Sequence, residues 1–129
     1  MRNREDIESY LMRSGLPIQE VEPNLWVVRD GSNGENIVIN LADPLVVFRV
    51  KVMDLAGVQN REMLFERLLS SNAQEMIHGS YGIANDAIVL TCSLRLENLD
   101  YNEFQGTIDD FSMALSNHYE TLASFRKSA

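Results

Sequence analysis

The chain has 129 residues, 45% of them hydrophobic, which is enough apolar side chain for one domain with a single core over residues 1–129. Its 19 acidic and 11 basic residues give a net charge of −8. A nucleic-acid binder needs a basic track to displace counterions from phosphates, so this charge argues against a nucleic-acid partner and against an anionic membrane surface.

The N-terminal part of the chain predicts a helix followed by strands. Asn3 and Asp6 have the spacing of a capped helix start, and apolar residues at helical spacing follow until Gly15 ends the run. Residues 18–22 lie between two prolines, so this segment can form at most a short edge strand. Residues 25–30 include the only tryptophan and favour a strand.

The next segments predict a hairpin and the clearest of the early strands. Residues 31–34 are Gly-Ser-Asn-Gly, which supplies positive-φ positions for a turn, and residues 35–41 alternate between apolar and polar. Residues 45–53 alternate strictly, and their apolar face is expected to lie in the core. Val46, Phe48 and Val50 share that face, and Arg49 and Lys51 lie on the other.

The second half predicts a helix, two strands and a long closing helix. Asn60 caps the first of these helices, and residues 79–83 and 87–96 form strands joined by a tight turn at Asn85-Asp86. Asp100 and Glu103 have the spacing of a capping box at the start of the last helix. This helix carries one continuous apolar stripe, expected to lie across the sheet. The stripe consists of Phe104, Ile108, Phe111, Leu115, Tyr119, Leu122 and Phe125.

Together these elements predict an α+β fold, in which an antiparallel curved sheet has the helices packed on it. The predicted order is α-β-β-β-α-β-β-α, with the short strand over residues 18–22 as an open addition. The strand at residues 87–96 is expected to contribute Ile88, Leu90, Cys92 and Leu94 to the core. Its other face, with Val89, Thr91 and Ser93, is small and β-compatible, which suits close approach of an identical element across a two-fold axis.

No group of residues has the spacing of a catalytic, metal or cofactor site. His78 and His118 lack accompanying cysteines or carboxylates at metal-ligand spacing, and a hydrogen-bonded packing role is expected for His118. Asp109 and Asp110 point about 100° apart on a helix and are expected to form a solvated face. Cys92 lies among apolar residues and is expected to be a buried structural thiol. The sequence therefore predicts no catalytic residue, no metal and no cofactor.

The ends of the chain and its one cysteine bear on cellular location. A single cysteine favours the reducing cytoplasm, because secreted domains of this size often carry several. The charged N-terminus is not followed by an apolar run, which argues against a signal peptide, and no stretch approaches the ~20 apolar residues of a membrane span. A cytoplasmic protein with no nucleic-acid or membrane partner is expected.

The second half also carries a resemblance to a known family. Its motifs are Leu68-Leu69-x-x-Asn72, Gly79-x-x-Gly82-Ile83, Ile88-Val89-Leu90 and Leu94-x-Leu96-x-x-Leu99. In these motifs the chain resembles the type III secretion chaperone-like superfamily and, within it, the YbjN family. The element order, length and acidic character are also similar, and the most specific part covers residues 64–122. The resemblance implies a curved antiparallel sheet carrying helices, usually in a homodimer.

The resemblance also implies which residues contact partners. In the secretion chaperones the second helix and the long later strand pack across the two-fold axis. Client segments wrap in extended form around apolar patches near the first helix and early strands. Carried over to this chain, the dimer-interface residues are Leu64, Leu68, Val89, Thr91 and Ser93. The partner-binding residues are Ile7, Tyr10, Leu11, Trp26 and Val28.

Three classes of function remain open. The first is a non-enzymatic, dimeric protein-binding module, a chaperone or adaptor whose client the sequence does not identify. The second is a stress or signalling regulator of the YbjN type, which acts through protein contacts or a small ligand. The third is an enzyme of unrecognised type, which would require a pocket with convergent polar groups and perturbed pKa values. We expect the first.

Overall fold

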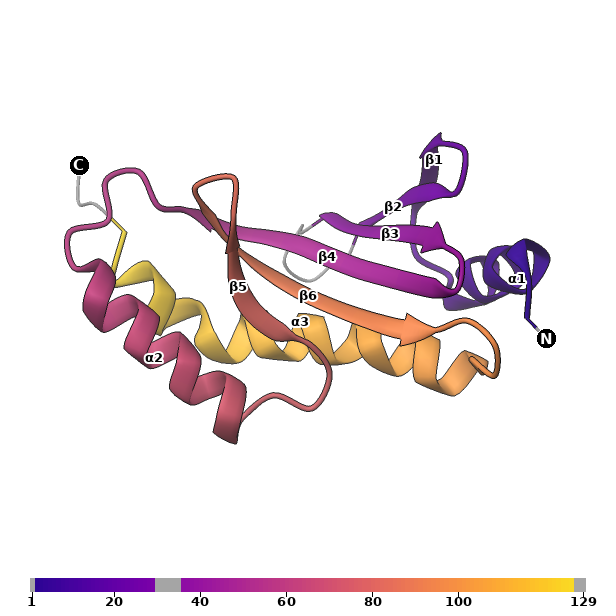
Figure 1. Ribbon diagram of the computed structural model, residues 1–129. Coiled ribbons are helices and arrows are strands. Elements are labelled where there is room, and N and C mark those ends of the chain that lie inside the picture. Colours follow the sequence, from indigo (N-terminus) through magenta and orange to yellow (C-terminus); the bar gives the residue numbers. More distant parts are fainter. Residues whose placement is uncertain (1, 30–35, 127–129) are drawn as a thin grey trace.

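A computed structural model describes residues 2–29 and 36–126. These residues form three helices and one six-stranded antiparallel sheet, in the order α-β-β-β-β-α-β-β-α (Figure 1). The helices are α1 (Arg4–Ser14), α2 (Arg61–Gln74) and α3 (Tyr101–Ala123). The strands are β1 (Ile18–Glu22), β2 (Leu25–Arg29), β3 (Asn36–Ala42), β4 (Leu45–Asp54), β5 (Ser80–Ala84) and β6 (Ala87–Arg95).

The predicted α+β fold class is confirmed, and the short strand left open by the sequence is present as β1. The predicted turn at residues 31–34 lies outside the described residues, although β2 and β3, on either side of it, do pair antiparallel. The turn at Asn85-Asp86 is confirmed. Both residues have positive φ, 53° and 58°, as a two-residue hairpin turn of the primed type requires.

The strand order in the sheet is β1-β2-β3-β4-β6-β5, so β4 and β6 lie at its centre. Their long antiparallel pairing places Phe48 opposite Cys92 and Val46 opposite Leu94. Helix α2 and strand β5 lie between β4 and β6 in the chain, and β5 then pairs with the far side of β6. The two edges of the sheet are therefore β1 and β5.

The helices begin where the sequence predicted. The Asn3 side chain accepts a hydrogen bond from the Asp6 N–H, and the Asp6 carboxylate accepts one from the Asn3 N–H, which completes a capping box at α1. Gly15, with φ of 73°, ends this helix in the left-handed conformation. Asp100 caps α3 by accepting from the Glu103 N–H at 2.7 Å.

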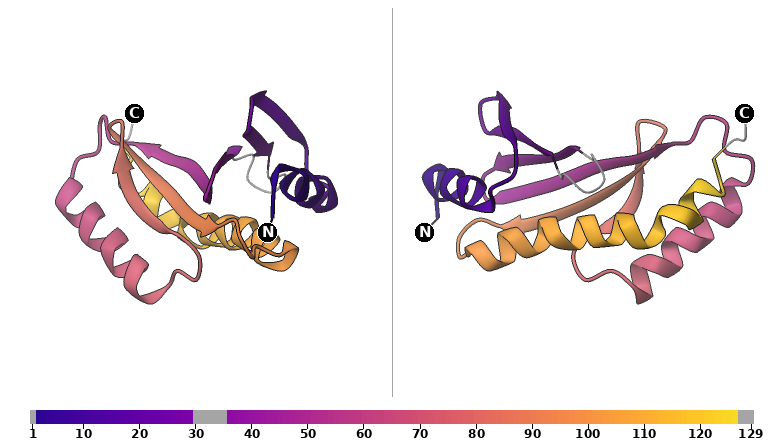
Figure 2. Two further views of the ribbon diagram at one scale, coloured as in Figure 1. Left: turned by 45° about the vertical axis from the view of Figure 1, so that its right-hand side comes forward. Right: turned by 180° about the vertical axis from the view of Figure 1, so that it is seen from behind.

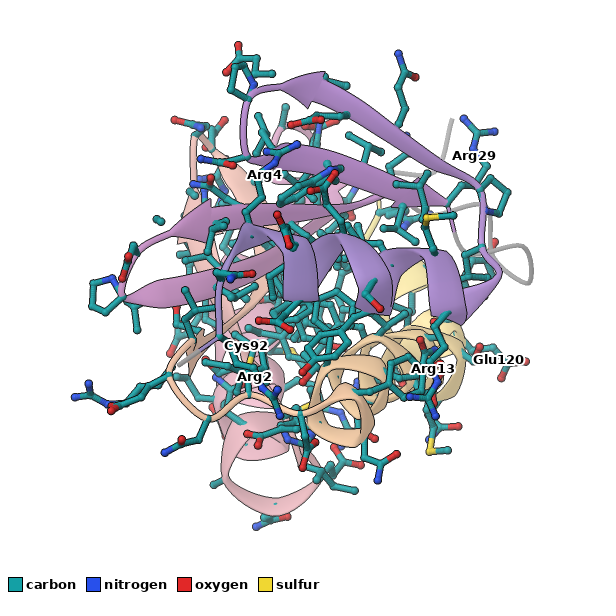
Figure 3. The ribbon with its side chains drawn as sticks, turned by 90° about the vertical axis from the view of Figure 1, so that its right-hand side faces the viewer. Arg2, Arg4, Arg13, Arg29, Cys92 and Glu120 are labelled. Atoms are coloured by element: carbon teal, nitrogen blue, oxygen red, sulfur yellow. The ribbon has the colours of Figure 1, made fainter. Side chains whose placement is uncertain are left out.

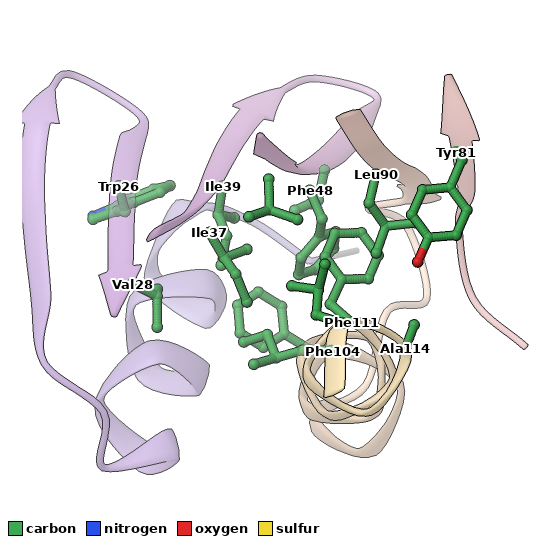
Figure 4. Close-up of a cluster of buried hydrophobic side chains, with 14 of the residues drawn as sticks. Trp26, Val28, Ile37, Ile39, Phe48, Tyr81, Leu90, Phe104, Phe111 and Ala114 are labelled. Atoms are coloured by element: carbon green, nitrogen blue, oxygen red, sulfur yellow. The ribbon is translucent and has the colours of Figure 1, made fainter. Parts of the chain in front are cut away.

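The core lies between one face of the sheet and the helices (Figure 4). Phe48 on β4 meets the rings of Phe104 and Phe111 on α3 edge-on, with ring centroids 5.3 and 6.4 Å apart. The predicted apolar face of β4 is fully buried, and so are Ile88 and Leu90 on β6, whereas Cys92 and Leu94, predicted to lie in the core as well, are only partly buried against it. These contacts fix α3 along the middle of the sheet.

The predicted stripe of α3 is wrong at one position. Tyr119 is 61% exposed, whereas its neighbour His118 is only 6% exposed. Adjacent helical positions differ by about 100°, so the C-terminal part of α3 presents His118 to the protein interior and Tyr119 to solvent. The other stripe residues, from Phe104 to Leu122, are buried, and Phe125 packs partly buried against the core.

Helix α1 contacts the hairpin of β1 and β2 through Arg4, which extends from the helix toward these strands (Figure 3). The Arg4 guanidinium donates to Glu20 at 2.8 Å and to the Asn24 side-chain oxygen at 2.5 Å, and it lies 5.1 Å from the centre of the Trp26 ring. Tyr10 anchors the same helix to the start of α3 by donating to the Leu99 carbonyl at 2.7 Å.

All three helices lie on one side of the curved sheet, and the opposite face carries no helix (Figure 2). The burial pattern agrees, because the inward positions of β2, β3 and β4 are buried while the alternate positions are half-buried or exposed. Among the described residues, no helix is both long enough and apolar enough to cross a membrane.

Candidate functional site

The edge strand β5 is held by a side chain from helix α2. The Asn72 side-chain oxygen accepts a hydrogen bond from the Tyr81 N–H at 2.7 Å, and the Asn72 amide donates to the Tyr81 carbonyl at 3.1 Å. This side chain therefore pairs with Tyr81 as a neighbouring strand would. Because the backbone groups of a strand alternate in direction, those of Ile83 point to the same open edge as those of Tyr81.

An apolar cavity of about 290 Å³ lies beside this edge, between α2 and β5. Its rim includes two large apolar side chains that face solvent, Leu69 at 68% and Ile83 at 58% exposure. Its lining consists of Phe65, Leu68, Leu69, Asn72, Tyr81, Gly82, Ile83 and Ile88. We name Leu69, Ile83 and this cavity the α2–β5 patch. An edge strand with exposed apolar side chains is a ready surface for association.

A polar chain supports the patch from beneath. The Tyr81 hydroxyl is hydrogen-bonded to His118 Nδ1 at 2.6 Å, and His118 Nε2 lies 3.5 Å from the Glu75 carboxylate. Burial raises the pKa of Tyr81 to about 12, so the phenol remains a neutral donor. The predicted hydrogen-bonded packing role of His118 is confirmed, and it links β5, α2 and α3.

The segment between α2 and β5 is fixed against α3 by His78 and Gly79. His78 Nδ1 and the Asp110 carboxylate lie 2.5 Å apart. Asp110 is therefore half-buried and paired, whereas a solvated face was expected for it and Asp109. Gly79 has φ of 84°, and a Cβ there would come within 2.8 Å of the Phe111 ring and 2.9 Å of the Thr91 carbonyl.

The structure separates the five predicted dimer residues into two groups. Leu64 and Leu68 on α2 are 0% and 5% exposed and pack in the core on the helix side of the sheet. Val89, Thr91 and Ser93 alternate with the core positions of β6 and so point to the opposite face. Val89 is itself only 6% exposed. The two groups therefore do not form one continuous surface on the monomer.

The five predicted partner-binding residues lie inside the monomer. Their exposed fractions are 0% for Ile7, 8% for Tyr10, 2% for Leu11, 3% for Trp26 and 0% for Val28. All five belong to the one hydrophobic core of the protein, and Tyr10 packs there against the Phe104 ring of α3, with ring centroids 5.5 Å apart. A client could touch these side chains only if this part of the core opened.

Among the described residues we looked for a metal-binding cluster and for an activated cysteine nucleophile. These residues contain no group of three or more histidine, cysteine or acidic side chains able to hold a metal ion. Cys92 is half-buried, and burial raises the pKa of its thiol, opposite to the shift that activates a nucleophile. The buried Tyr81 and His118 and the exposed Glu75 join β5, α3 and the end of α2. What the geometry does present is apolar surface.

The sequence analysis missed the two exposed residues of the α2–β5 patch. Leu69 and Ile83 stand in the family motifs, where apolar residues were interpreted as core. The sequence offers only a weak signal, which is that β5 is a short strand. Which strand forms the edge depends on the pairing order, and periodicity does not give that order.

Comparisons with known proteins agree with this architecture. A family model described as CesT_Tir_1 matches residues 1–128. No curated protein matches the chain. Among solved structures, a chain of the ExsC–ExsE complex is similar with a TM-score of 0.68 and 14% identity, covering 92% of this chain and 94% of that chain.

Two further solved structures share the fold. One is a chain of the heterodimeric ExoU–SpcU complex from the type III secretion system of Pseudomonas aeruginosa, with a TM-score of 0.67, 16% identity and coverage of 86% and 93%. The other is YbjN from E. coli, described as a putative transcription regulator, with a TM-score of 0.66, 16% identity and coverage of 93% for both chains. The family model spans nearly the whole chain, and the chain therefore belongs to the CesT_Tir_1 family of type III secretion chaperones.

Proposed function

We propose that this protein is a homodimeric chaperone or adaptor that binds other proteins in the cytoplasm and acts without catalysing a reaction. The observation that carries the dimer is the α2–β5 patch. It combines exposed apolar side chains, a cavity of about 290 Å³ and an edge strand whose Ile83 backbone groups point outward.

A second copy of this chain is the proposed occupant of the patch. A two-fold axis brings the same patch of each protomer together, so Ile83 and Leu69 of one copy would cover those of the other. Asn72 already holds the Tyr81 end of the β5 edge, which keeps the strand in place for such contact. The predicted interface residue Leu68 lines the cavity of this patch. In this proposal Val89, Thr91 and Ser93 lie outside the interface.

Protein binding is supported by the family and by the printed names of two similar structures. ExsC with ExsE and SpcU with ExoU are both complexes of two proteins. The charge of −8 and the single half-buried cysteine suit a cytoplasmic protein with no nucleic-acid or membrane partner. A regulator similar to YbjN is the second candidate, favoured by the structural similarity to YbjN over 93% of the chain.

Co-purification from the native host separates the two candidates. A chaperone or adaptor is expected to carry one protein in a fixed stoichiometry, which mass spectrometry would identify and which the purified pair would reproduce after mixing. The absence of any stoichiometric partner across growth and stress conditions would contradict the chaperone and favour the regulator.

A further inference from the structure

The helix-free face of the sheet differs in charge from the rest of the molecule. The four inner strands of the sheet, β2, β3, β4 and β6, together contain one acidic residue, Asp54, and four basic ones, whereas the edge strand β1 carries two acidic residues, Glu20 and Glu22. Three of these basic residues, Arg49, Lys51 and Arg95, occupy outward positions on β4 and β6 and are exposed. The inner strands thus bring together basic residues that are far apart in the sequence.

The register places apolar side chains among these cations. Val38 on β3 lies opposite Arg49, and Val27 on β2 lies opposite Val38. Val47, two residues before Arg49, points to the same face, and all three valines are half-buried. We name Val27, Val38, Val47, Arg49, Lys51 and Arg95 the open sheet face (its helix-free side is visible in Figure 1).

Two basic residues of this face, Arg49 and Arg95, have no carboxylate partner among the described residues. The Lys51 ammonium is 2.7 Å from the Asp54 carboxylate, which satisfies much of its charge. Within residues 2–29 and 36–126, no carboxylate lies within 4.0 Å of the Arg49 or Arg95 guanidinium, and neither makes a hydrogen bond. Guanidinium groups recognise carboxylates with two parallel donors, so these two arginines are fit to receive acidic side chains.

The spacing of the two arginines defines what they can bind. Arg49 pairs with Thr91, four residues from Arg95 along β6, which corresponds to about 13 Å along the strand. Two acidic residues four positions apart in an extended segment span the same distance. A residue midway between them would lie over Val47, where an apolar side chain fits.

We propose that the open sheet face binds an acidic, extended segment of a protein client, with carboxylates four residues apart and an apolar residue between them. This inference rests on the proposed protein-binding function and adds the chemistry of the client and the place where it docks. The α2–β5 patch lies at the β5 edge on the helix side, so the proposed dimer leaves the open sheet face uncovered. The negative charge on the rest of the surface would repel an acidic segment there and so favour its binding to the open sheet face.

A labelled peptide tests the proposal directly. The probe is a fluorescent peptide with two repeats of acidic, spacer, apolar, spacer, acidic residues, compared with a version carrying Gln for each carboxylate and a version carrying Lys. Fluorescence anisotropy should show saturable binding of the acidic peptide alone. Binding should weaken as salt rises, because exposed charge pairs are screened.

Matched variants locate the site. Arg49→Gln/Arg95→Gln should weaken binding of the acidic peptide on the order of fivefold to tenfold, as the loss of two exposed charge pairs predicts. Arg67→Gln/Arg126→Gln removes the same charge from α2 and from the segment that follows α3, and it should change the affinity less than about twofold. Far-ultraviolet circular dichroism of each variant checks that the fold is kept.

Several outcomes would overturn the proposal. These are equal binding of the Gln peptide, equal weakening by both double variants, tighter binding of a single-stranded oligonucleotide, or no binding of the acidic peptide at all. A further contradicting outcome can come from sedimentation of the protein without peptide. If the native protein formed higher oligomers that dissociate in Arg49→Gln/Arg95→Gln, the open sheet face would bind a second copy of the chain instead. None of these outcomes removes the stoichiometric client from the native host, so failure here is distinguishable from failure of the proposed function.

Discussion

Asn72 on helix α2 pairs with the backbone of Tyr81 on strand β5 through two hydrogen bonds, of 2.7 and 3.1 Å. The side chain thereby closes part of the open edge of the sheet. Asn is suited to this role because its amide offers one acceptor and one donor side by side, as a peptide group does. The Asn72 in the family motif therefore has a structural explanation that does not involve a partner.

Substitution of Asn72 should destabilise the monomer, even where the new side chain keeps the acceptor oxygen and lacks only the amide donor. Asn72→Ala leaves the Tyr81 N–H and carbonyl unpaired and should cost about 1–3 kcal/mol in the free energy of unfolding. Asn72→Asp keeps the acceptor but sets an oxygen against the Tyr81 carbonyl, so it should be no better than Ala. Urea unfolding measures both, and full stability of Asn72→Asp would show that the second hydrogen bond contributes nothing.

Gly79 should resist substitution much more than another glycine. Its φ of 84° and the close approach of Phe111 and the Thr91 carbonyl predict that Gly79→Ala costs on the order of 2–4 kcal/mol. Gly106 on α3 has open space around it, and Gly106→Ala should stabilise by about 0.5–1 kcal/mol, since alanine favours a helix. Thermal unfolding of the two variants gives the comparison, and a tolerated Gly79→Ala would contradict the described packing.

The buried Tyr81 phenol should make stability fall at alkaline pH. Its pKa rises from the ordinary value of 10 to about 12 on folding, so the neutral form is favoured in the folded state. This contribution is complete below the unfolded pKa and is lost as the pH rises from about 10 to 12. The stability advantage of the native protein over Tyr81→Phe should therefore shrink across that window in urea unfolding. A constant difference would mean that the phenol ionises normally.

The Cys92 thiol should react slowly in the folded protein. Burial raises its pKa and lowers the thiolate fraction at neutral pH, while the Gly79 backbone amide opposes this only in part. Iodoacetamide should alkylate the native protein at least about tenfold more slowly than the urea-unfolded chain at the same pH. Equal rates would reopen a redox or nucleophilic role for this cysteine.

Much of the fold could be predicted because local patterns determine it. The alternation of β4 and the apolar stripe of α3 fixed the faces that form the core, and Asn3, Asn60 and Asp100 marked where helices begin. These signals depend on residues close in sequence. The same patterns do not determine whether His118 or Tyr119 points to the interior, because that depends on how the C-terminal part of α3 packs against β5.

The surfaces were harder to predict because they depend on contacts between distant elements. The apolar face of a helix, such as that of Ile7 and Leu11, has the same sequence pattern whether a client or the protein's own core covers it, and here the core does. The pairing of His78 with Asp110 joins residues 32 positions apart, and no spacing rule reports it. The exposure of Ile83 follows from its place on an edge strand, which only the complete sheet order reveals.

Sedimentation of three proteins tests the central proposal, a homodimer formed through the α2–β5 patch. Val89 is too buried to serve as a probe, because Val89→Arg would disturb the monomer as well. Ile83→Glu instead places a charge at an exposed position that meets its own copy across the two-fold axis. Met12→Glu, at 80% exposure on α1, is the matched control.

At micromolar concentration the native protein and Met12→Glu are predicted to sediment as dimers and Ile83→Glu as a folded monomer. A native monomer would contradict the dimer, and a dimeric Ile83→Glu would place the interface elsewhere.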